Sequence, residues 1–456
     1  MNIARVSGSG NARALVLFAG WGMDERPFEG LNKAGYDIFV IWDYRTDTLD
    51  FAALGHYSEL CVVAWSWGVL PAARFLVSGH GLPVTLAVAV NGTLHPVDDR
   101  RGIPYDIFQG THDSLEPRRL LKFYRRMMPD AASMERFKAV MPHREIEELK
   151  EELRAIAAMP VPEGVEERRL AAQFDAVALS RGDAIIPYDN QRKAWEGIAA
   201  CESVDGAHYP DFAAIIDRWL VEKELVRQKF SDAASTYPSE SAPQQAIAWR
   251  LMELWEAQNP MPGGTVVEVG VGTGYFTSLY SQRLHPSSLR LWDLYESSTG
   301  VEACDAETAI RSLPDESVDV VAGASAVQWF NSLNAFFAEV VRVLRPGGFG
   351  VFSTFAPDHF AALNSITGRS LNFPAVMRIE GAEWLADVTE TLPVTFSSPA
   401  QMLRHLKLSG VNSLMSGPEA AVGARRILRD YPRDSDGRVT LVYRPHYIIF
   451  RKKPCR

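Results

Sequence analysis

Cysteine is scarce in this sequence, and long apolar runs are absent. The four cysteines, Cys61, Cys201, Cys304 and Cys455, lie far apart and form no CxxC or Cys/His spacing. We therefore expect neither a disulfide framework nor a zinc site, and no other metal. The most apolar stretch, residues 82–90, is far shorter than the roughly 20 residues of a membrane-spanning helix, which excludes a membrane-spanning protein.

Positive charge is also in short supply. Lys and Arg number 47 against 56 Asp and Glu, a formal net charge of -9, whereas nucleic-acid-binding domains usually carry a strongly basic face. The first 20 residues lack the charged region, apolar core and cleavage site of a secretion signal, so the cytoplasm is the expected location. With 47% apolar residues the chain can bury enough surface to fold, which excludes intrinsic disorder.

Two successive α/β patterns run along the chain. Buried parallel strands are predicted first at 14–22, 37–43, 60–68, 84–93 and 174–183, and then within 264–276, 289–294, 318–325 and 347–355. Charged segments at 113–128 and 143–159 have helical spacing. Residues 211–226 also have helical spacing and lack Gly and Pro, so we expect one helix to join two α/β domains there.

The first domain contains a candidate nucleophile. Ser66 lies in Ala64-Trp65-Ser66-Trp67-Gly68, between an apolar strand and a helical stretch, which is the setting of a nucleophile elbow with small residues around the serine. Asp183 follows a later strand and His208 lies in a loop before a helix; Ser, Asp, His is the chain order of α/β-hydrolases. Ser66 would attack, His208 would take its proton, and Asp183 would orient the imidazole.

Two backbone N–H groups are candidates for an oxyanion hole. Trp21 lies in a Gly-Trp-Gly turn after the first strand, and Trp67 directly follows the serine; one such donor is typically worth about 3 kcal/mol. Each residue also has a structural interpretation, with Ser66 as a turn serine, Asp183 as a helix cap and His208 as a surface side chain. The joint order of all elements favours a serine hydrolase.

A family resemblance makes this prediction more specific. The stretches that carry it are FAGWGMDERPF (18–28), WDYR (42–45), AWSWG (64–68) and NGTLHPVDDRRGIP (91–104). They resemble the BioG class of pimeloyl-carrier-protein methyl ester esterases of biotin synthesis. The resemblance implies an α/β-hydrolase domain over residues 1–217 with a helical lid at about 105–175, acting on a pimeloyl methyl ester held on acyl carrier protein.

The second domain opens on a glycine turn between a strand and a helix. Its spacing is GxGxG rather than the GxGxxG of dinucleotide binders, and an acidic residue stands two positions before the first glycine. This form resembles class I methyltransferases with a Rossmann-like fold that bind S-adenosylmethionine. The resemblance implies a cofactor site formed by Glu268, Gly270, Gly272, Gly274, Asp293, Asp305 and Ala306. A Rossmann-like fold without methyl transfer is the alternative.

Finer features resemble the BioC family of malonyl-carrier-protein O-methyltransferases. They are KFSDAASTYPSESAPQQAIA (229–248), DAETAIRSLPDESVDVVAGASAVQWF (305–330), VLRPGGFGVFSTF (343–355) and SSPAQMLRHLKLSGVN (397–412). The resemblance implies a methyltransferase domain over 229–456, after a linker at 218–228. It also implies that Tyr237 closes over the cofactor and that Gln328 and Trp329 line the methyl donor, although Tyr237 and Trp329 could equally be core aromatics.

The carrier protein implied by both resemblances is acidic, so basic docking faces are expected. Arg118, Lys122 and Arg125 fall on one face of a predicted helix, with Arg119 and Arg126 beside them. A solvated lid helix explains the same pattern equally well. In the second domain, Arg404 and Lys407 could meet the carrier. No nucleic acid or membrane partner is expected.

One segment departs from the methyltransferase pattern. Only eleven residues separate Asp293 from Asp305, where the class normally has a full helix, so the cofactor pocket could be more open or its activity lost. Two alternatives to a bifunctional enzyme therefore stay open. One is an active esterase with a non-catalytic carrier-binding module, and the other is a generic carboxylesterase fused to a small-molecule methyltransferase. In the bifunctional case, we expect the lid to discriminate acyl chain length, which would prevent premature hydrolysis.

Overall fold

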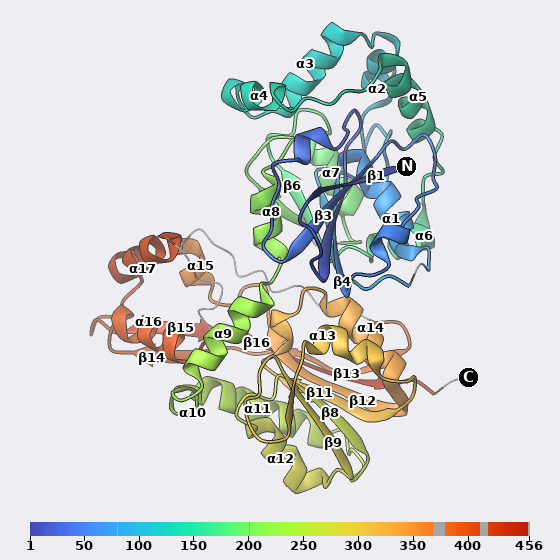
Figure 1. The fold of residues 1–456 in the computed structure, drawn as a ribbon. Helices are drawn as coiled ribbons and strands as arrows, with labels where there is room; N and C mark the ends of the chain where they lie inside the picture. Colours follow the sequence, from blue (N-terminus) through green and yellow to red (C-terminus); the bar gives the residue numbers. More distant parts are fainter. Residues whose placement is uncertain (80, 200, 368–378, 411–417, 455–456) are drawn as a thin grey trace. The chain divides into compact units, whose positions relative to one another are not determined.

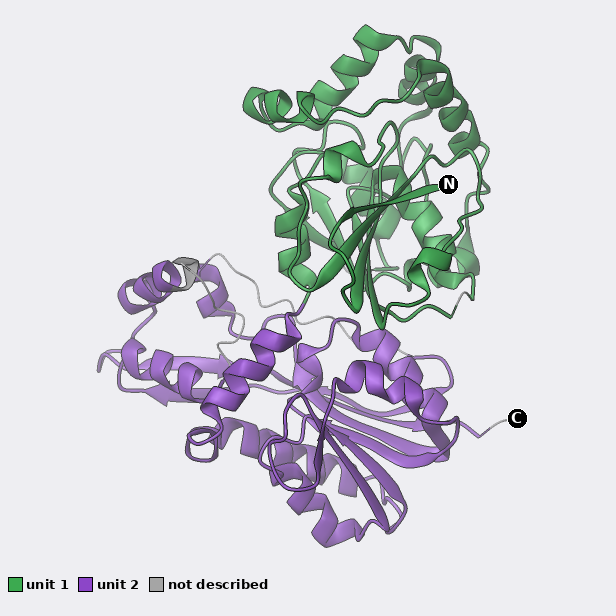
Figure 2. Ribbon diagram, in the orientation of Figure 1, with its two compact units in different colours: residues 1–220 green, residues 221–456 purple. Residues whose placement is uncertain are grey.

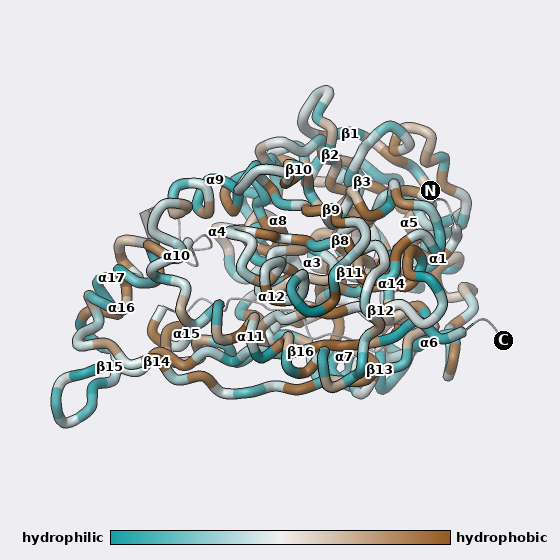
Figure 3. The backbone as a smooth tube through the Cα atoms, turned by 90° about the horizontal axis from the view of Figure 1, so that it is seen from below, coloured by the Kyte–Doolittle hydropathy of each residue, from teal (hydrophilic) through white to brown (hydrophobic). Residues whose placement is uncertain are grey.

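A computed structural model describes the whole chain except residues 80, 200, 368–378, 411–417 and 455–456. The chain divides into two compact units, Met1–Leu220 and Val221–Arg456 (Figure 2). Each unit has its own buried core around its own sheet. Hydrophobic residues gather along the central strands in Figure 3, and hydrophilic ones on the outer loops.

Unit 1 is built on a seven-stranded sheet of order β1-β3-β2-β4-β5-β6-β7 (Figure 1). Its strands are β1 Asn2–Ser7, β2 Arg13–Phe18, β3 Tyr36–Trp42, β4 Glu59–Trp65, β5 Val84–Val90, β6 Ala176–Ser180 and β7 Cys201–Val204. Among these, β1 alone pairs antiparallel. The five predicted strands are confirmed, and they are buried on both faces. Strands β1 and β7 lie at the edges of the sheet and contain no fully buried residue, so neither stands out as an apolar run.

Eight α-helices complete unit 1 within the described residues. They are α1 Val69–Val77, α2 Tyr105–Asp113, α3 Pro117–Met127, α4 Ala131–Lys138, α5 Ile146–Ala157, α6 Gly164–Ala171, α7 Tyr188–Trp195 and α8 Phe212–Trp219. Helices α2–α5 form a layer beyond the sheet (Figure 1), which we call the lid. The expected lid of 105–175 is too long, because α6 packs instead against α1 and buries Leu170 and Ala171 in the main core.

Unit 2 contains a seven-stranded sheet of order β10-β9-β8-β11-β12-β16-β13 and a two-stranded sheet of β14 and β15. The strands are β8 Thr265–Val269, β9 Ser288–Asp293, β10 Val301–Ala303, β11 Val318–Ala324, β12 Leu344–Phe355, β13 Ala382–Thr389, β14 Leu392–Phe396, β15 Val439–Tyr443 and β16 Pro445–Lys452. Strand β16 runs antiparallel to both neighbours. Alternate residues of the central strands enter two separate buried clusters, as Val266 and Val267 do, so both faces of the sheet are covered.

The helices of unit 2 are α9 Lys223–Ala233, α10 Tyr237–Glu240, α11 Ala242–Glu256, α12 Tyr275–Leu284, α13 Ala306–Ala309, α14 Leu333–Val343, α15 Ala361–Thr367, α16 Pro399–Leu408 and α17 Pro418–Asp430. The single helix expected over 211–226 is wrong. The chain is extended at Leu220, and the N–H of Val221 donates to Asn331 Oδ1 at 2.8 Å, so α8 ends and α9 starts anew. Residues 223–228, expected in a linker, belong to α9 of unit 2.

Two candidate active sites

Ser66 lies on a tight turn between β4 and α1. Its φ is 57°, a left-handed value that is strained for a residue with a Cβ. The turn leaves no room for larger neighbours, because a Cβ on Gly68 would lie 2.4 Å from the Phe18 carbonyl oxygen and one on Gly92 would lie 2.2 Å from that of Ser66. The expected elbow therefore has the predicted shape, and Gly92 is a further glycine that the turn requires.

The structure brings the three predicted side chains into one hydrogen-bonded series. His208 Nε2 lies 2.9 Å from Ser66 Oγ, and His208 Nδ1 lies 2.8 Å from Asp183 Oδ2. The side chains of His208 and Asp183 are almost completely buried. Since a buried carboxylate next to Nδ1 favours the proton on that nitrogen, Nε2 is left free to accept the serine proton.

Further buried groups hold this series in place. Asp183 Oδ1 accepts the N–H groups of Ile185 and Ile186, and Oδ2 also accepts Gln191 Nε2 at 2.8 Å. On the histidine side, Asn91 Nδ2 and Trp65 Nε1 donate to the His208 carbonyl oxygen at 2.9 and 2.7 Å. Sequence reasoning singled out neither residue: Gln191 lies outside the motifs quoted above, and Asn91 opens the stretch 91–104 with nothing in the sequence to show its contact with His208.

The two candidate oxyanion residues, Trp21 and Trp67, line the same pocket as Ser66. A Cβ on Gly20 would lie 3.0 Å from Ser66 Cβ, so the loop that carries Trp21 passes directly against the serine. The rings of Trp21 and Trp67 are 6.1 Å apart, and their indole N–H groups donate to the carbonyl oxygens of Leu149 and Pro96. Both tryptophans are thus fixed beside the nucleophile.

A pocket of about 460 Å³, open to solvent, adjoins Ser66. Apolar side chains of the lid contribute much of its wall, among them Ile107, Phe108 and Phe123, and Arg126 is the cation that lines it. Arg126 also donates to the Ala184 carbonyl oxygen at 2.6 Å. The pocket thus places apolar side chains of the lid next to the serine.

In unit 2, the glycine turn joins β8 to α12. Gly270, Gly272 and Gly274 all have positive φ, at 67°, 56° and 74°, the region that glycine alone enters without penalty. They differ in surroundings, since a Cβ on Gly270 would lie 2.2 Å from that of Ala326, whereas one on Gly272 would meet nothing within 4 Å. Gly270 is needed for packing, and Gly272 faces open space.

The predicted acids lie around this turn. Glu268 is buried, and its Oε2 accepts the hydroxyls of Thr277 and Tyr280; burial raises the pKa of Glu268 to about 7. Asp293 Oδ2 accepts the Gly272 N–H at 2.7 Å, and burial also raises the pKa of Asp293. Asp293, which was expected in the cofactor site, therefore already binds the glycine turn.

Asp305 caps α13 and forms an ion pair with Lys223 of α9. The Lys223 Nζ lies 3.2 Å from Asp305 Oδ1 and 2.7 Å from Oε2 of the buried Glu307. Lys223 was not predicted, because the sequence gives no sign that the start of α9 reaches α13.

A pocket of about 1190 Å³, open to solvent, runs along the glycine turn. The predicted residues that line it are Glu268, Gly270, Gly272, Asp293, Asp305, Ala306, Tyr237 and Trp329. Gly274 instead starts α12, and Gln328 lies buried in the short 3-10 turn Val327–Trp329, where its Nε2 donates to the Ser325 carbonyl oxygen. These two residues adjoin the pocket without lining it.

The wall of this pocket combines aromatic rings with unpaired polar atoms. The Phe230 ring centroid lies 6.2 Å from that of Tyr237 and 5.8 Å from that of Trp329, so α9 supplies an aromatic residue that sequence reasoning missed. Four lining residues carry buried polar atoms with no hydrogen-bond partner among the described residues: Gln244 Oε1, Ser297 Oγ, Ser325 Oγ and Trp329 Nε1. A polar ligand could satisfy them.

The shortened segment after β9 contains no helix, as expected from its length. Residues 294–300 pass from β9 to the three-residue strand β10, and Leu294, Tyr295 and Ser297 line the pocket. The segment therefore still contributes to the wall where a helix would usually stand.

The predicted docking cations are exposed in both units. Arg118, Arg119, Lys122 and Arg125 lie on α3, and no acid of the described chain lies within ion-pair distance of them. Arg404 and Lys407 are exposed on α16. Across the described residues, no helix has the length and apolarity to cross a membrane, and no cluster of metal-binding side chains occurs.

Comparison with known proteins relates each unit to a family. Residues 1–219 match the family model of pimeloyl-ACP methyl esterase BioG, and residues 267–352 match that of a methyltransferase domain. A solved BioG structure from Haemophilus influenzae is 33% identical and covers 46% of this chain and 94% of that one, with a TM-score of 0.41.

Relatives also match beyond single units. A malonyl-[acyl-carrier protein] O-methyltransferase of Bacteroides thetaiotaomicron is 31% identical over 262 residues, which are 51% of this chain and 99% of that protein. A protein of the same description from Bacteroides fragilis is 32% identical over 466 residues, covering 96% of this chain and 93% of the relative. The chain therefore belongs to the family of the Bacteroides fragilis malonyl-[acyl-carrier protein] O-methyltransferase, with a BioG domain at its N-terminus and a methyltransferase domain at its C-terminus.

Proposed function

We propose that the chain methylates the free carboxylate of malonyl-[acyl-carrier protein] and hydrolyses the methyl ester of pimeloyl-[acyl-carrier protein]. The first reaction would use S-adenosylmethionine in unit 2, and the second would occur at Ser66 in unit 1. The series from Ser66 through His208 to Asp183, with its 2.9 and 2.8 Å contacts, carries the esterase assignment. A methyl cap on the malonyl carboxylate has a physical purpose, because a charged carboxylate is costly to bury in the apolar channel of a chain-elongating enzyme.

In the esterase reaction, Ser66 Oγ attacks the ester carbonyl carbon while His208 Nε2 takes the serine proton. Asp183 stabilises the imidazolium, and the N–H groups of Trp21 and Trp67 bind the negative oxygen of the tetrahedral intermediate. Collapse of that intermediate expels methanol, which leaves with the proton from His208. Water then attacks the acyl-enzyme by the same steps and releases the pimeloyl carboxylate.

In the methyltransferase reaction, S-adenosylmethionine would supply an electrophilic methyl group. The residues of the pocket fit S-adenosylmethionine. Among the described residues, four buried polar atoms of the pocket have no hydrogen-bond partner, and the absence of a Cβ at Gly272 leaves open space. Asp293, Asp305 and Ala306 would hold the nucleoside, and Tyr237, Phe230 and Trp329 would exclude water. A malonyl carboxylate is ionised at neutral pH and needs no general base. The protein therefore needs only to align the carboxylate with the methyl group and to exclude water from the site.

Both reactions would take an acidic carrier protein as partner. The unpaired cations Arg118, Arg119, Lys122 and Arg125 lie on α3, the lid helix whose Phe123 and Arg126 line the esterase pocket. A carrier bound there would present its acyl chain to Ser66. Arg404 and Lys407 are the corresponding candidates in unit 2.

Growth without biotin tests both activities at once. Strains that lack either activity are supplied with the intact chain, with Ser66→Ala or with Gly272→Asp. Each variant is expected to fail only in the strain that lacks its own activity. Hydrolysis of malonyl and pimeloyl methyl esters by the purified chain then tests the lid, and equal rates would contradict discrimination by chain length.

The short segment 294–300 supports a second candidate, in which unit 2 only binds the carrier. Calorimetric titration with S-adenosylmethionine separates the two. Heat of binding that is lost in Gly272→Asp supports the methyltransferase, and no binding at millimolar cofactor supports the module.

A further inference from the structure

The loop that carries Trp21 is held by side chains from outside it. Three of its carbonyl oxygens accept such hydrogen bonds: Ala19 from Tyr44 OH at 2.6 Å, Gly22 from Tyr124 OH at 2.8 Å, and Met23 from Arg144 Nη1 at 3.1 Å. Asp24 Oδ2 also accepts the N–H of His143 at 2.6 Å. The backbone is thus held on both sides of Trp21, at the carbonyls of Ala19 and Gly22.

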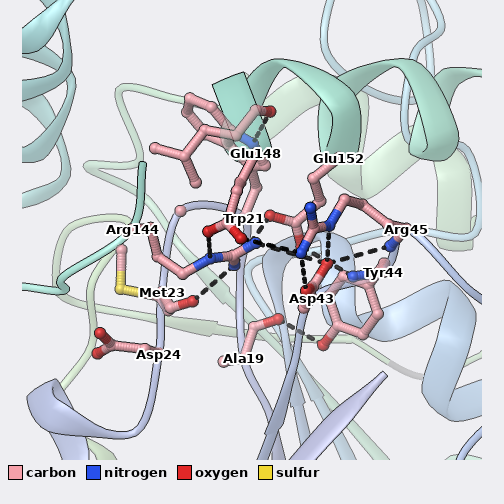
Figure 4. Close-up of polar contacts among 12 residues, drawn as sticks. Ala19, Trp21, Met23, Asp24, Asp43, Tyr44, Arg45, Arg144, Glu148 and Glu152 are labelled. Atoms are coloured by element: carbon pink, nitrogen blue, oxygen red, sulfur yellow. Dashed lines mark hydrogen bonds and ion pairs between the residues drawn. The ribbon is translucent and has the colours of Figure 1, made fainter. Parts of the chain in front are cut away.

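Most of these contacts come from the lid. Tyr124 lies on α3, Arg144 lies two residues before the start of α5, and the Trp21 indole N–H donates to the Leu149 carbonyl oxygen within α5 at 3.0 Å. Figure 4 shows α5 lying over the loop, with the Arg144 side chain reaching the Met23 carbonyl. We call residues 19–24, which carry Trp21, the oxyanion loop. This loop and the lid therefore share one set of contacts.

Buried charges hold this arrangement together. Arg144, only 5% exposed at its side chain, lies 3.2 Å from Glu152 Oε2 and 3.4 Å from Asp43 Oδ1. The other oxygen of Glu152 accepts the backbone N–H of Tyr44 at 2.9 Å. A continuous path of hydrogen bonds thus runs from Arg144 through Glu152 and Tyr44 to the Ala19 carbonyl (Figure 4).

Stability alone does not account for such a cluster. Burying ions is expensive, and apolar residues of similar volume often give equal or greater stability. Ion pairs and hydrogen bonds fix the orientation of the groups they join, and an oxyanion hole needs its donor placed within a few tenths of an ångström. The cluster lies beside the loop whose N–H groups need such exact placement.

We propose that Tyr44, Arg144 and Glu152 are positioning residues that hold the oxyanion loop and make hydrolysis depend on the docking of lid helix α5. The proposal rests on the proposed esterase function. These three residues are not among the described residues that line the pocket, so they act through the loop and not on the substrate. The lid is then part of the catalytic centre as well as its cover.

Replacing Tyr44 by phenylalanine tests the proposal with the loss of one hydroxyl. Tyr57→Phe is the matched control, because Tyr57 is equally buried in unit 1 and its hydroxyl donates to Asp37, at a site unrelated to the loop. Since a missing oxyanion donor lowers kcat by about 10²–10³-fold, a misplaced one should lower kcat of Tyr44→Phe by about 10-fold with little change in KM. Affinity for a trifluoromethyl ketone, which forms a tetrahedral adduct with Ser66, should fall by the same factor.

Tyr124→Phe, which frees the Gly22 carbonyl, should show the same pattern as Tyr44→Phe. Thermal unfolding of each variant distinguishes positioning from lost structure, since a merely structural role would shift the melting temperature without a matching change in ketone affinity. The proposal is overturned if Tyr44→Phe and Tyr124→Phe keep kcat and ketone affinity within about twofold of the intact chain, or if Tyr57→Phe loses as much. An intact chain without esterase activity would instead refute the proposed function, and this inference with it.

Discussion

Replacing Asp183 by asparagine is expected to remove most of the esterase activity and keep the fold. The carboxylate accepts four donors: Ile185 N and Ile186 N on Oδ1, and Gln191 Nε2 and His208 Nδ1 on Oδ2. Asparagine retains one acceptor oxygen. That oxygen is expected to stay with the two backbone N–H groups, so the turn that ends β6 should survive.

The size of the loss in kcat follows from the amide nitrogen, which would take the place of Asp183 Oδ2. An NH₂ group would then face two donors, so His208 must turn its proton to Nε2 and accept at Nδ1 instead. Nε2 then donates to Ser66 Oγ and cannot take its proton. A triad with the wrong histidine tautomer loses about 10⁴-fold in kcat, which corresponds to about 5–6 kcal/mol.

The assay is hydrolysis of a pimeloyl methyl ester under saturating conditions, together with thermal unfolding. Asp37→Asn provides the control, since Asp37 is also fully buried and accepts several donors, among them Tyr57 OH and Asn11 Nδ2. It should lower the melting temperature and leave kcat unchanged. If Asp183→Asn kept more than about a tenth of kcat, the assigned role of Asp183 would be refuted.

Three further predictions concern other parts of the chain. Gly270→Ala should lower the melting temperature strongly because its Cβ has no room, whereas Gly272→Ala should fold and bind S-adenosylmethionine about tenfold more weakly by calorimetry, and equal melting would contradict this. Burial raises the pKa of Glu268 from 4.5 to about 7, so between these pH values the folded state holds a proton that the unfolded chain releases. The free energy of unfolding should therefore fall by up to about 3 kcal/mol as the pH rises from 4.5 to 7. Denaturant titrations at several pH values should show a weaker pH dependence of this free energy for Glu268→Gln. Reversing the charges of Arg118 and Lys122 to Glu should raise KM for a carrier-bound ester about tenfold, weaken its salt dependence, and leave hydrolysis of a small methyl ester unchanged.

How far the sequence predicted the fold depended on the kind of strand. Strands β2, β4 and β5 are buried on both faces and stand out as apolar runs. Strand β13 consists mostly of exposed and half-buried residues, and β10 has only three residues, so no apolar run distinguished them from loops. The break after α8 also escaped prediction, because helical spacing runs through it, whereas in the fold Leu220 is extended and the N–H of Val221 bonds to Asn331 instead of continuing the helix.

For the candidate sites, the sequence by itself determined the residues whose chemistry is local. Short motifs at the ends of strands give Ser66 on its turn, Gly270 and Gly272 after β8, and the order of Asp183 and His208. Within each unit, parallel strands bring such strand ends to one edge of the sheet. Only the tertiary structure decided what surrounds them. The contact between Tyr44 and Glu152 joins residues 108 positions apart, and the ring contact of Phe230 with Trp329 joins two separate elements, so linear spacing carries no signal for either. Gln191 lies only eight residues from Asp183, but its hydrogen bond depends on how the turn after β6 folds back.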